Sequence, residues 1–345
     1  MALAKKGIEE IIVHTGQHYD ENMSEIFFSQ MKIPKPAYNL QLGHLSHGAM
    51  TGRMTEKIES LILDLQPDYV LVYGDTNSTL AAAIATSKSD AKLIHIEAGL
   101  RSFNMKMPEE INRIVTDRLS DILFCPTPVA VKNLKDEGFE NFITKSGKKI
   151  QIELVGDVMK DSAKYFSNFA ASNCSKTIFS LIEKEFALCT LHRAENVKHP
   201  ERMESIFSAL NSISQNVPII LPLHPGTKKA IEDYRIISSK NITIIDPVGF
   251  FDMLMLLQNC KAVLTDSGGL QKEAFFFKKP CITLRDETEW IELVENGYNF
   301  LAGADQSLIE KYFEQSEAVD FSTAKPLYGE GCVSDKIAGI ILSQI

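Results

Sequence analysis

The stretch Lys261-Ala-Val-Leu-Thr-Asp-Ser-Gly-Gly-Leu-Gln-Lys-Glu-Ala-Phe-Phe-Phe277 joins a short apolar run to a segment of helical composition. Residues 261–265 are typical of a buried parallel strand and residues from 270 onward predict a helix, so residues 266–269 form the turn between them. Such a turn suits a phosphate group, because glycines let the backbone approach a ligand and the N–H groups of a new helix point at the anion.

Three kinds of residue in this stretch are candidates for nucleotide binding. Gly268 and Gly269 leave room for the ligand, and Ser267 offers a hydroxyl and a helix cap. Glu273 follows about one helical turn later, where a carboxylate can bind both hydroxyls of a ribose. The alternative interpretation is an ordinary capped helix start with a solvated glutamate.

Strand-like and helix-like segments alternate along the rest of the chain, and the strands are apolar on both faces. This pattern predicts an α/β protein of two doubly wound, Rossmann-like parallel-sheet domains, with ligands bound beyond the carboxyl ends of the strands. We place the first domain at residues 1–165 and the second at 166–330. The segment 331–345 has helical spacing and is expected to cross back to the first domain, and residues 167–176, rich in Ser and Asn, are the candidate hinge.

Composition excludes several classes of protein. The 345 residues are 44% hydrophobic and 23% charged, values that are ordinary for a soluble globular protein of about two domains. A net charge of −9 argues against nucleic-acid or anionic-membrane partners, and no apolar run is long enough to span a bilayer. The six cysteines form no CxxC pair, so we expect buried thiols, no metal site and a cytoplasmic location.

Polar residues cluster where the predicted strands end. In the first domain these are the carboxylates Asp75, Glu97 and Glu109, whose mutual repulsion near one crevice would raise at least one pKa toward neutrality, as a general acid or base requires. In the second domain His192 and His224 supply groups that titrate near pH 7, and Arg193 supplies a guanidinium group whose paired N–H donors suit a phosphate. Each has an ordinary structural alternative: a turn residue, a helix-start charge or a strand-end histidine.

Together these residues resemble a known family. The motifs occur in order as Thr15-Gly-Gln-His18, Gly74-Asp-Thr-Asn-Ser78, His95-Ile-Glu-Ala-Gly-Leu-Arg101, Pro108-Glu-Glu-Ile-Asn-Arg113, His192-Arg-Ala-Glu-Asn196, His224-Pro225 and Thr265-Asp-Ser-Gly-Gly-Leu-Gln-Lys-Glu273. They look like the non-hydrolysing UDP-N-acetylglucosamine 2-epimerases, whose two domains face a central cleft as in GT-B glycosyltransferases. The resemblance covers nearly the whole chain.

The resemblance implies an isomerase without a cofactor that inverts C2 of a UDP-sugar for the synthesis of cell-envelope polysaccharides. In that family UDP is eliminated to leave a glycal, and it then adds back with a proton delivered to the opposite face. Carried over by motif, the catalytic set is Asp75, Glu97, Glu109 and His192, and the UDP site is Ser267, Gly268, Gly269 and Glu273 with Arg193 and His224 nearby. His18, Arg113 and Arg285 are further candidates, and a homodimer is usual in the family.

Two departures from the family pattern bear on the function. The family begins with a strand and a Gly-Thr-Arg-Pro-Glu-like turn, whereas this sequence opens with residues 2–7, which look like the last turn of a helix. We therefore expect a truncated or mis-started chain, and an intact mass of the native protein matching residues 1–345 would contradict a mis-start. The second departure is Trp290, where the common pattern has an arginine; we expect this tryptophan to pack rather than to stack on the ligand.

The form Arg285-Asp-Glu-Thr-Glu-Trp290 resembles a branch of the family that acts on UDP-diacetamido-uronic acids. The main interpretation is thus the interconversion of UDP-N-acetylglucosamine and UDP-N-acetylmannosamine, and UDP-2,3-diacetamido-2,3-dideoxyglucuronic acid is the alternative substrate. A GT-B glycosyltransferase and an inactive UDP-sugar-binding remnant are the competing functions. The carboxylate cluster favours the epimerase, because a transferase needs an acceptor site instead.

Overall fold

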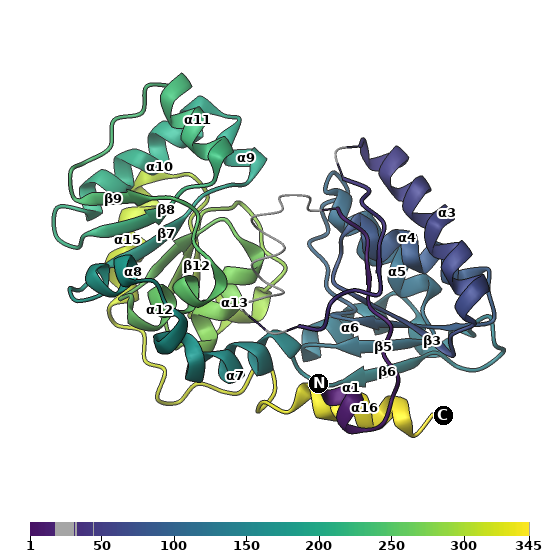
Figure 1. Ribbon diagram of the computed structural model, residues 1–345. Helices are drawn as coiled ribbons and strands as arrows, with labels where there is room; N and C mark the ends of the chain where they lie inside the picture. The colour runs from purple at the N-terminus through teal and green to yellow at the C-terminus, as the bar shows by residue number, and fades with distance from the viewer. Residues whose placement is uncertain (18–30, 32, 44, 345) are drawn as a thin grey trace. The chain divides into compact units, whose positions relative to one another are not determined.

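The computed structural model describes residues 1–17, 31, 33–43 and 45–344, which fold into two compact units. Unit 1 comprises Met1–Asp161 and Pro326–Ile345, and unit 2 comprises Ser162–Lys325 (Figure 1). Each unit has one main parallel sheet covered by helices, so the predicted α/β class with two Rossmann-like sheets is confirmed.

Unit 2 is built on a six-stranded parallel sheet with the strand order β12-β11-β10-β7-β8-β9. The order reverses between β7 and β10, which is the topological switch point where doubly wound sheets bind ligands. The elements are α8 (Lys176–Leu181), β7 (Ala187–Thr190), α9 (Ala194–Val197), α10 (Pro200–Ile213), β8 (Ile219–Pro222), α11 (Pro225–Asp233), β9 (Ile242–Ile245), α12 (Phe250–Asn259), β10 (Val263–Thr265), α13 (Gly268–Phe276), β11 (Cys281–Thr283), α14 (Ile291–Glu295), β12 (Asn299–Leu301) and α15 (Gln306–Ser316).

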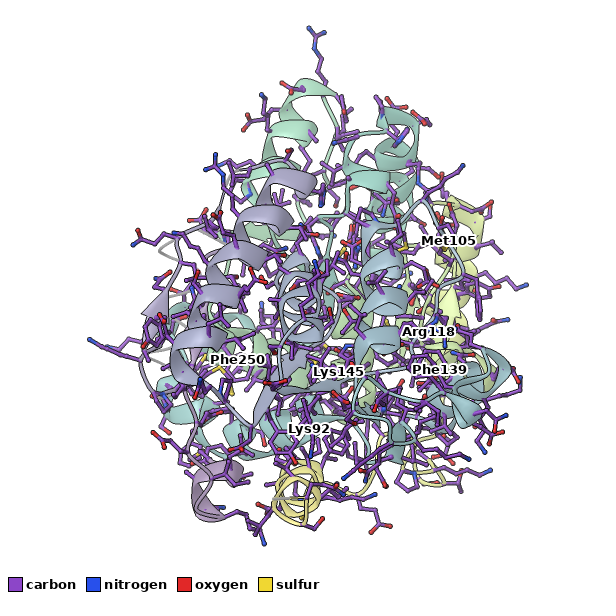
Figure 2. The ribbon with its side chains drawn as sticks, turned by 90° about the vertical axis from the view of Figure 1, so that its right-hand side faces the viewer. Lys92, Met105, Arg118, Phe139, Lys145 and Phe250 are labelled. Atoms are coloured by element: carbon purple, nitrogen blue, oxygen red, sulfur yellow. The ribbon has the colours of Figure 1, made fainter. Side chains whose placement is uncertain are left out.

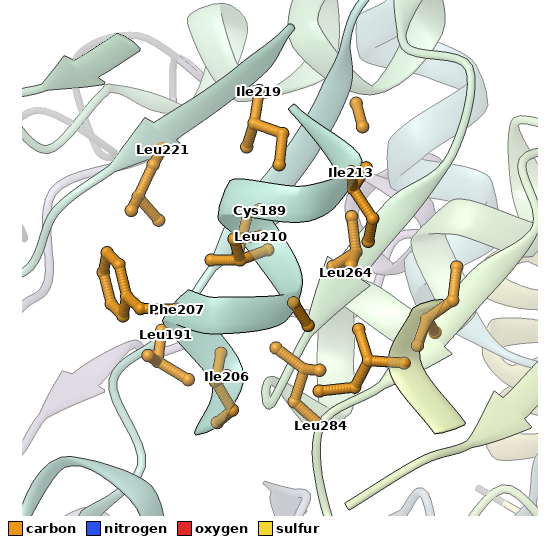
Figure 3. Packing of buried hydrophobic residues seen from close by; sticks show 14 of the residues in the cluster. Cys189, Leu191, Ile206, Phe207, Leu210, Ile213, Ile219, Leu221, Leu264 and Leu284 are labelled. Carbon is orange, nitrogen blue, oxygen red and sulfur yellow. The ribbon is translucent and has the colours of Figure 1, made fainter. Parts of the chain in front are cut away.

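The two faces of this sheet are buried in separate apolar clusters, because successive residues of a strand point to opposite faces. On one face Cys189 and Leu191 pack with Ile206 and Leu210 of α10 (Figure 3). On the other face Leu188 packs in the cluster that includes α12 and α13. Burial on both sides explains why these strands are continuous apolar runs in the sequence.

Unit 1 contains two parallel sheets rather than one. A four-stranded sheet has the order β3-β4-β5-β6, and β1 pairs with β2 in a separate two-stranded sheet. Among the described residues no backbone ladder joins β1 to β3; the end of β1 is linked instead to the start of α4 by a hydrogen bond of 2.6 Å between Thr15 Oγ1 and Ser78 Oγ. The elements are α1 (Ala2–Lys5), β1 (Val13–His14), β2 (Tyr38–Asn39), α3 (His47–Leu65), β3 (Tyr69–Tyr73), α4 (Asn77–Ser87), β4 (Lys92–Ile96), α5 (Pro108–Leu119), β5 (Ile122–Cys125), α6 (Pro128–Asp136), η1 (Phe139–Asn141), β6 (Gln151–Leu154), α7 (Val158–Asn173) and α16 (Val333–Leu342).

The C-terminal helix α16 packs in unit 1, against the same sheet face as α1. Ile337 and Ile341 lie in one cluster with Ile94 of β4, and α1 lies beside α16 (Figure 1). The carboxylate of Asp161 accepts hydrogen bonds from the N–H groups of Cys332 and Ser334, at 2.8 and 2.7 Å. These bonds tie the start of α16 to the helix that leads out of unit 1, which anchors the returning chain.

Two cations brace the outer parts of unit 1, where Figure 2 labels both. Lys145 donates hydrogen bonds of 2.6 to 2.9 Å to the carbonyl groups of Thr86, in the last turn of α4, and of Ser89 and Ala91, between α4 and β4. The guanidinium carbon of Arg118 lies 4.7 Å from the ring centroid of Phe139. The Lys145 bonds satisfy carbonyls at the end of α4 and just after it, and the Arg118 contact joins α5 to η1.

The candidate hinge at residues 167–176 is mostly helical, because most of this segment belongs to α7 and α8 begins at Lys176. Ser and Asn are tolerated here since their side chains bond to carbonyls one turn back: Asn173 Nδ2, for example, donates to Phe169 O at 2.8 Å. The buried residues Ala163 and Ala170 then hold the helix against its neighbours. In the part of the chain that the structure describes, no helix is long and apolar enough to cross a membrane.

Candidate functional site

The turn between β10 and α13 has the geometry that its sequence predicts. Ser267 caps the helix, its Oγ accepting a hydrogen bond from Leu270 N at 3.4 Å, and its own N–H donates to Thr265 Oγ1 at 2.9 Å. A Cβ at Gly268 would lie 2.5 Å from Glu289 Oε1, so a larger residue there would require the Glu289 side chain to move. The first N–H groups of α13 have no intrahelical acceptors, so the helix start can donate hydrogen bonds to a ligand.

Asp266 joins this turn to the loop after β7. Its buried carboxylate accepts hydrogen bonds from the N–H groups of His192, at 3.0 Å, and Arg193, at 2.9 Å, and from Asn196 Nδ2 at 3.2 Å. Burial alone would raise the pKa of Asp266, but the contact with His192 and these backbone N–H groups outweigh burial and lower it. Asp266 is thus an ionised anchor that holds the ends of β7 and β10 together.

The loop after β7 brings two predicted residues to the turn. Arg193 Nη2 lies 3.8 Å from the place where a Cβ of Gly268 would be, so the guanidinium flanks the turn. His192 Nδ1 lies 3.2 Å from Asp266 Oδ1, and its side chain is 43% exposed, which leaves the ring accessible to a ligand. A cation and an imidazole therefore lie beside a helix start, an arrangement suited to a phosphate ester.

Three other predicted residues of unit 2 lie around this centre. Glu273 is half-buried in α13, beyond its first turn. His224 follows β8, is exposed, and caps α11 by accepting a hydrogen bond from Gly226 N at 3.2 Å, which is the ordinary strand-end role. Arg285 is fully buried, with Nη1 2.9 Å from Glu289 Oε2 and Nε 3.3 Å from Glu195 Oε1.

Two cavities lie at the carboxyl ends of the unit 2 strands, on either side of the switch point. The first, of about 630 Å³, is lined by Arg202, Arg285 and Asp286 among others. The second, of about 470 Å³, lies at the ends of β8 and β9 and includes Lys228 and Asp246. Both cavities lie at the edge that a doubly wound sheet uses for ligands, but of the predicted nucleotide-site residues only Arg285 is among their lining residues.

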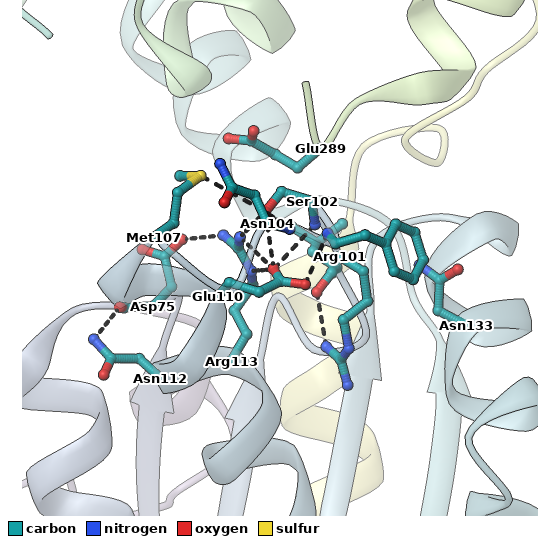
Figure 4. Close-up of polar contacts among 12 residues, drawn as sticks. Asp75, Arg101, Ser102, Asn104, Met107, Glu110, Asn112, Arg113, Asn133 and Glu289 are labelled. Atoms are coloured by element: carbon teal, nitrogen blue, oxygen red, sulfur yellow. Dashed lines mark hydrogen bonds and ion pairs between the residues drawn. The ribbon is translucent and has the colours of Figure 1, made fainter. Parts of the chain in front are cut away.

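In unit 1 Asp75 is held at the end of β3 by Arg113. The guanidinium of Arg113 lies 2.6 Å from Asp75 Oδ2 and 2.7 Å from Glu110 Oε2, and it is almost completely buried (Figure 4). Asn112 Nδ2 donates to Asp75 O at 2.8 Å, which fixes the backbone as well. Asp75 itself is 35% exposed, so its carboxylate is positioned but open to a ligand.

Glu97 occupies a strained backbone conformation at the end of β4. Its φ is +73°, a left-handed value that is uncommon for residues other than glycine and costs on the order of 1 kcal/mol or more. Its Oε2 lies 3.2 Å from the place where a Cβ of Gly74 would be, next to Asp75. Backbone strain of this kind clusters at active sites, so the conformation supports Glu97 as a functional residue.

A buried hydrogen-bond network holds the backbone next to Asp75 and Glu97. His95 lies between two hydrogen-bond acceptors, with Nε2 2.8 Å from Gly74 O and Nδ1 2.7 Å from Asp117 Oδ1. Asp117 also accepts from Arg101 Nη1 at 2.7 Å and from Gly99 N at 3.2 Å. Burial by itself would raise the pKa of Asp117, but His95 and Arg101 hold it below its usual range.

The two glutamates that follow Pro108 at the start of α5 have different surroundings. Glu109 is half-buried, one turn before Arg113 on the same side of α5. Glu110 is buried, accepts N–H groups from Ser102 and Phe103, and is held ionised, its pKa lowered against the opposing effect of burial by these bonds and by Arg113. Unit 1 thus brings together Asp75, Glu97 and Arg113; His18 lies outside the described residues.

Sequence reasoning missed Asp266, Asp117, His95 and Glu110 as parts of the site. For α5 a signal was present: Glu110, Arg113 and Asp117 recur at helical spacing and make one charged stripe. Asp266 follows the last residue of a buried strand, where an acidic residue that accepts N–H groups from a neighbouring loop is hard to distinguish from a turn residue.

Comparison with known proteins identifies the family. The family model described as UDP-N-acetylglucosamine 2-epimerase matches residues 1–342. The chain belongs to the UDP-N-acetylglucosamine 2-epimerase family. The resemblance drawn from the ordered motifs is confirmed, and with it the GT-B-like fold and the enzyme class, an isomerase of UDP-sugars.

Three members of this epimerase family illustrate the similarity. A UDP-2,3-diacetamido-2,3-dideoxy-D-glucuronate 2-epimerase of Pseudomonas aeruginosa is 54% identical, over 97% of this chain and 92% of the relative. A UDP-N-acetylglucosamine 2-epimerase of Methanococcus maripaludis is 41% identical, over 96% and 91%. The crystal structure of Methanocaldococcus jannaschii UDP-GlcNAc 2-epimerase in complex with UDP-GlcNAc and UDP superposes with a TM-score of 0.89 at 40% identity, covering 99% and 94%.

The buried carboxylates of this epimerase predict an acid-labile fold. Folding lowers the pKa of Asp117, Asp266 and Glu110, so the stability they contribute is complete above their unfolded values of about 4 and is lost as the pH falls through the lower folded values. We expect the free energy of unfolding, measured in urea, to be level from pH 7 to about 5 and to fall steeply below about 4. Asp136→Asn, at an exposed surface pair, should leave this profile unchanged; a flat native profile down to pH 3 would contradict the prediction.

Proposed function

We propose that this epimerase inverts C2 of a UDP-2-acetamido sugar by elimination and re-addition of UDP. The observation that carries the proposal is the turn Ser267–Gly269 at the switch point. Its helix start, the absence of a side chain at Gly268 and the nearby guanidinium of Arg193 suit a diphosphate. Glu273 is proposed to bind the ribose hydroxyls, and His224 and Arg285 to lie near the nucleotide. His18 is a further candidate by its motif.

The chemistry requires two proton transfers and a stabilised leaving group. A base takes the proton from C2 while the bond between C1 and the diphosphate oxygen breaks, which gives a glycal and UDP. The diphosphate oxygen then bonds to C1 again as an acid delivers a proton to the opposite face of C2. We propose Asp75, Glu97, Glu109 and His192 for the proton transfers, with Arg113 holding Asp75.

Two substrates are candidates, and each has its own support. UDP-N-acetylglucosamine is the substrate that most of the family's relatives are named for. UDP-2,3-diacetamido-2,3-dideoxyglucuronic acid is favoured by the 54% identity to the Pseudomonas aeruginosa enzyme that acts on it. The two differ at C3, which bears a hydroxyl or an acetamido group, and at C6, which is a hydroxymethyl or a carboxylate.

Incubation of the chain with each UDP-sugar in deuterated water tests the proposal. We expect the C2 proton signal to disappear from the NMR spectrum of at least one sugar as the manno-configured product forms, with no acceptor present. The sugar that exchanges faster at equal concentration is the substrate. Turnover only with an added acceptor would indicate a glycosyltransferase, and UDP binding without exchange of either sugar would indicate an inactive binding protein.

We also propose that the enzyme acts as a homodimer in the cytoplasm. The resemblance to the family supports both statements. Sedimentation velocity of the purified chain at micromolar concentration is expected to give the mass of two copies of the 38.5 kDa chain. A single species at the mass of one copy would contradict the dimer.

A further inference from the structure

Lys272 and Trp290 form a buried pair behind the turn of the proposed nucleotide site. The ammonium nitrogen of Lys272 lies 4.2 Å from the centroid of the Trp290 ring, and the two residues are 0% and 2% exposed. Lysine is almost never fully buried unless it is paired, since an ammonium ion loses its hydration there. The face of a tryptophan ring is the aromatic surface that attracts a desolvated cation most strongly.

Trp290 is bonded directly to the turn. Its Nε1–H donates a hydrogen bond of 3.0 Å to the carbonyl oxygen of Gly268, the first residue of α13. The backbone reinforces this contact: Trp290 N donates to Thr288 Oγ1 at 3.1 Å, and Thr288 Oγ1 donates to Gln271 Oε1 at 2.8 Å. The segment that carries Trp290 is thus tied to α13 at Gly268 and again at Gln271.

Lys272 provides a further contact between α13 and the Trp290 ring. It lies one helical turn after Gly268 in α13, so the ring that binds the Gly268 carbonyl also lies against the ammonium group of the same helix. The carboxylate of Glu289 also lies close to this glycine, with Oε1 2.5 Å from the place where a Cβ of Gly268 would be. The Trp290 ring therefore contacts α13 at two points one helical turn apart, the Gly268 carbonyl and the Lys272 ammonium group.

We propose that Trp290 and Lys272 act as one unit that positions the Ser267–Gly269 turn to bind the diphosphate. This inference rests on the proposed function of the turn. It also bears on the departure at residue 290, because an arginine there would put a second cation against Lys272. Trp290 and Lys272 are positioning residues, since they act on the ligand through Gly268.

Two single substitutions test the two contacts separately. Trp290→Phe keeps a ring beside Lys272 but removes the donor to Gly268, and we expect UDP to bind about threefold to tenfold more weakly by calorimetry. Lys272→Met keeps the length of the side chain but removes the charge, and we expect a loss of about tenfold. In both variants KM for the UDP-sugar should rise by these factors, while kcat changes by less than about threefold.

A paired exchange tests whether the residues act as a unit. Lys272→Glu alone puts an anion on the ring face and Trp290→Arg alone puts two cations together, so each should weaken UDP binding by about thirtyfold or more. The double variant restores an attractive pair, and we expect its affinity to return to within about fivefold of the native value. A double variant that binds no better than the weaker single variant would overturn the proposal.

A matched control is available in the same unit. Lys311 lies 5.9 Å from the ring centroid of Tyr312 on the exposed side of α15, and Lys311→Met should leave UDP binding unchanged. Trp290 is the one tryptophan in the sequence, so its fluorescence reports on this position alone, and UDP should change its emission in the native protein and less in Lys272→Met. Thermal unfolding of each variant shows whether it is folded.

The outcomes separate this inference from the proposed function. If native protein binds UDP and Trp290→Phe and Lys272→Met bind it equally well, the positioning role is wrong and the proposed function stands. If native protein does not bind UDP, both are wrong. If the double variant does not fold, UDP binding by Trp290→Phe and Lys272→Met tests the positioning role instead. Each of these variants removes one contact and keeps most of the buried volume.

Discussion

Replacing Glu97 by Gln is expected to lower kcat by about 10² to 10⁴, the usual contribution of a positioned acid or base. Gln keeps the size and the polar end of the side chain but cannot take up or release the proton at C2. The binding of UDP should stay within about twofold, since we place the nucleotide on unit 2 residues. Steady-state epimerisation and calorimetry with UDP measure the two effects.

The strain at Glu97 makes this prediction specific. A left-handed φ of +73° at a glutamate is kept by its surroundings at a cost to stability, which is expected where the side chain is needed for function. Glu97→Gly should therefore be at least as stable as the native protein and inactive. Glu56→Gln, on the exposed side of α3, is the control and should keep full activity. A Glu97→Gln enzyme with kcat within threefold of native would remove Glu97 from the catalytic set.

Replacing Asp117 by Asn is expected to lower the free energy of unfolding by about 3–5 kcal/mol, the cost of removing one partner from a buried ion pair. Asp117 is fully buried and contacts His95 and Arg101, both at 2.7 Å. Asparagine keeps the shape but leaves the buried guanidinium of Arg101 with Glu137 as its remaining acidic partner in this network. Urea denaturation at pH 7 measures the loss, and Asp64→Asn on the exposed side of α3 is the control.

This substitution should also reduce activity, because the network reaches the candidate site. His95 contacts the carbonyl of Gly74, the residue before Asp75, at 2.8 Å. Loss of the Asp117 carboxylate frees the ring that holds this turn, so we expect kcat to fall about tenfold or more even where the protein is folded. Since the pKa of Asp117 is lowered in the folded state, the variant should also lose less stability than the native protein between pH 5 and 3. An unchanged stability at pH 7 would contradict the prediction.

Much of the fold follows from sequence pattern. The apolar runs of unit 2 predict its strands because both sheet faces are covered, as the alternation of Leu188 and Cys189 between two clusters shows. The turn at Ser267 follows from glycine conformation and capping chemistry, which act over a few residues. The division of the unit 1 sheets did not follow, because strand pairing depends on contacts between distant segments.

Helix α5 shows why part of the candidate site escaped sequence reasoning. Its buried residues are polar, among them Glu110, Arg113 and Asp117, whereas the apolar Ile111 is 42% exposed. A rule that buries the apolar face therefore turns this helix the wrong way. The charges are buried at acceptable cost because each meets an opposite charge or a backbone N–H group from another segment.

By itself, the sequence determined the α/β class, the family and the residue types at the strand ends, because these depend on local pattern and on ordered motifs. Only the tertiary structure decided which of these side chains are held together: Asp266 across β7 and β10, Arg113 between Asp75 and Glu110, and Trp290 on Gly268. The physical reason is that a buried polar group is stable only with its partners in place, and those partners come from distant parts of the chain.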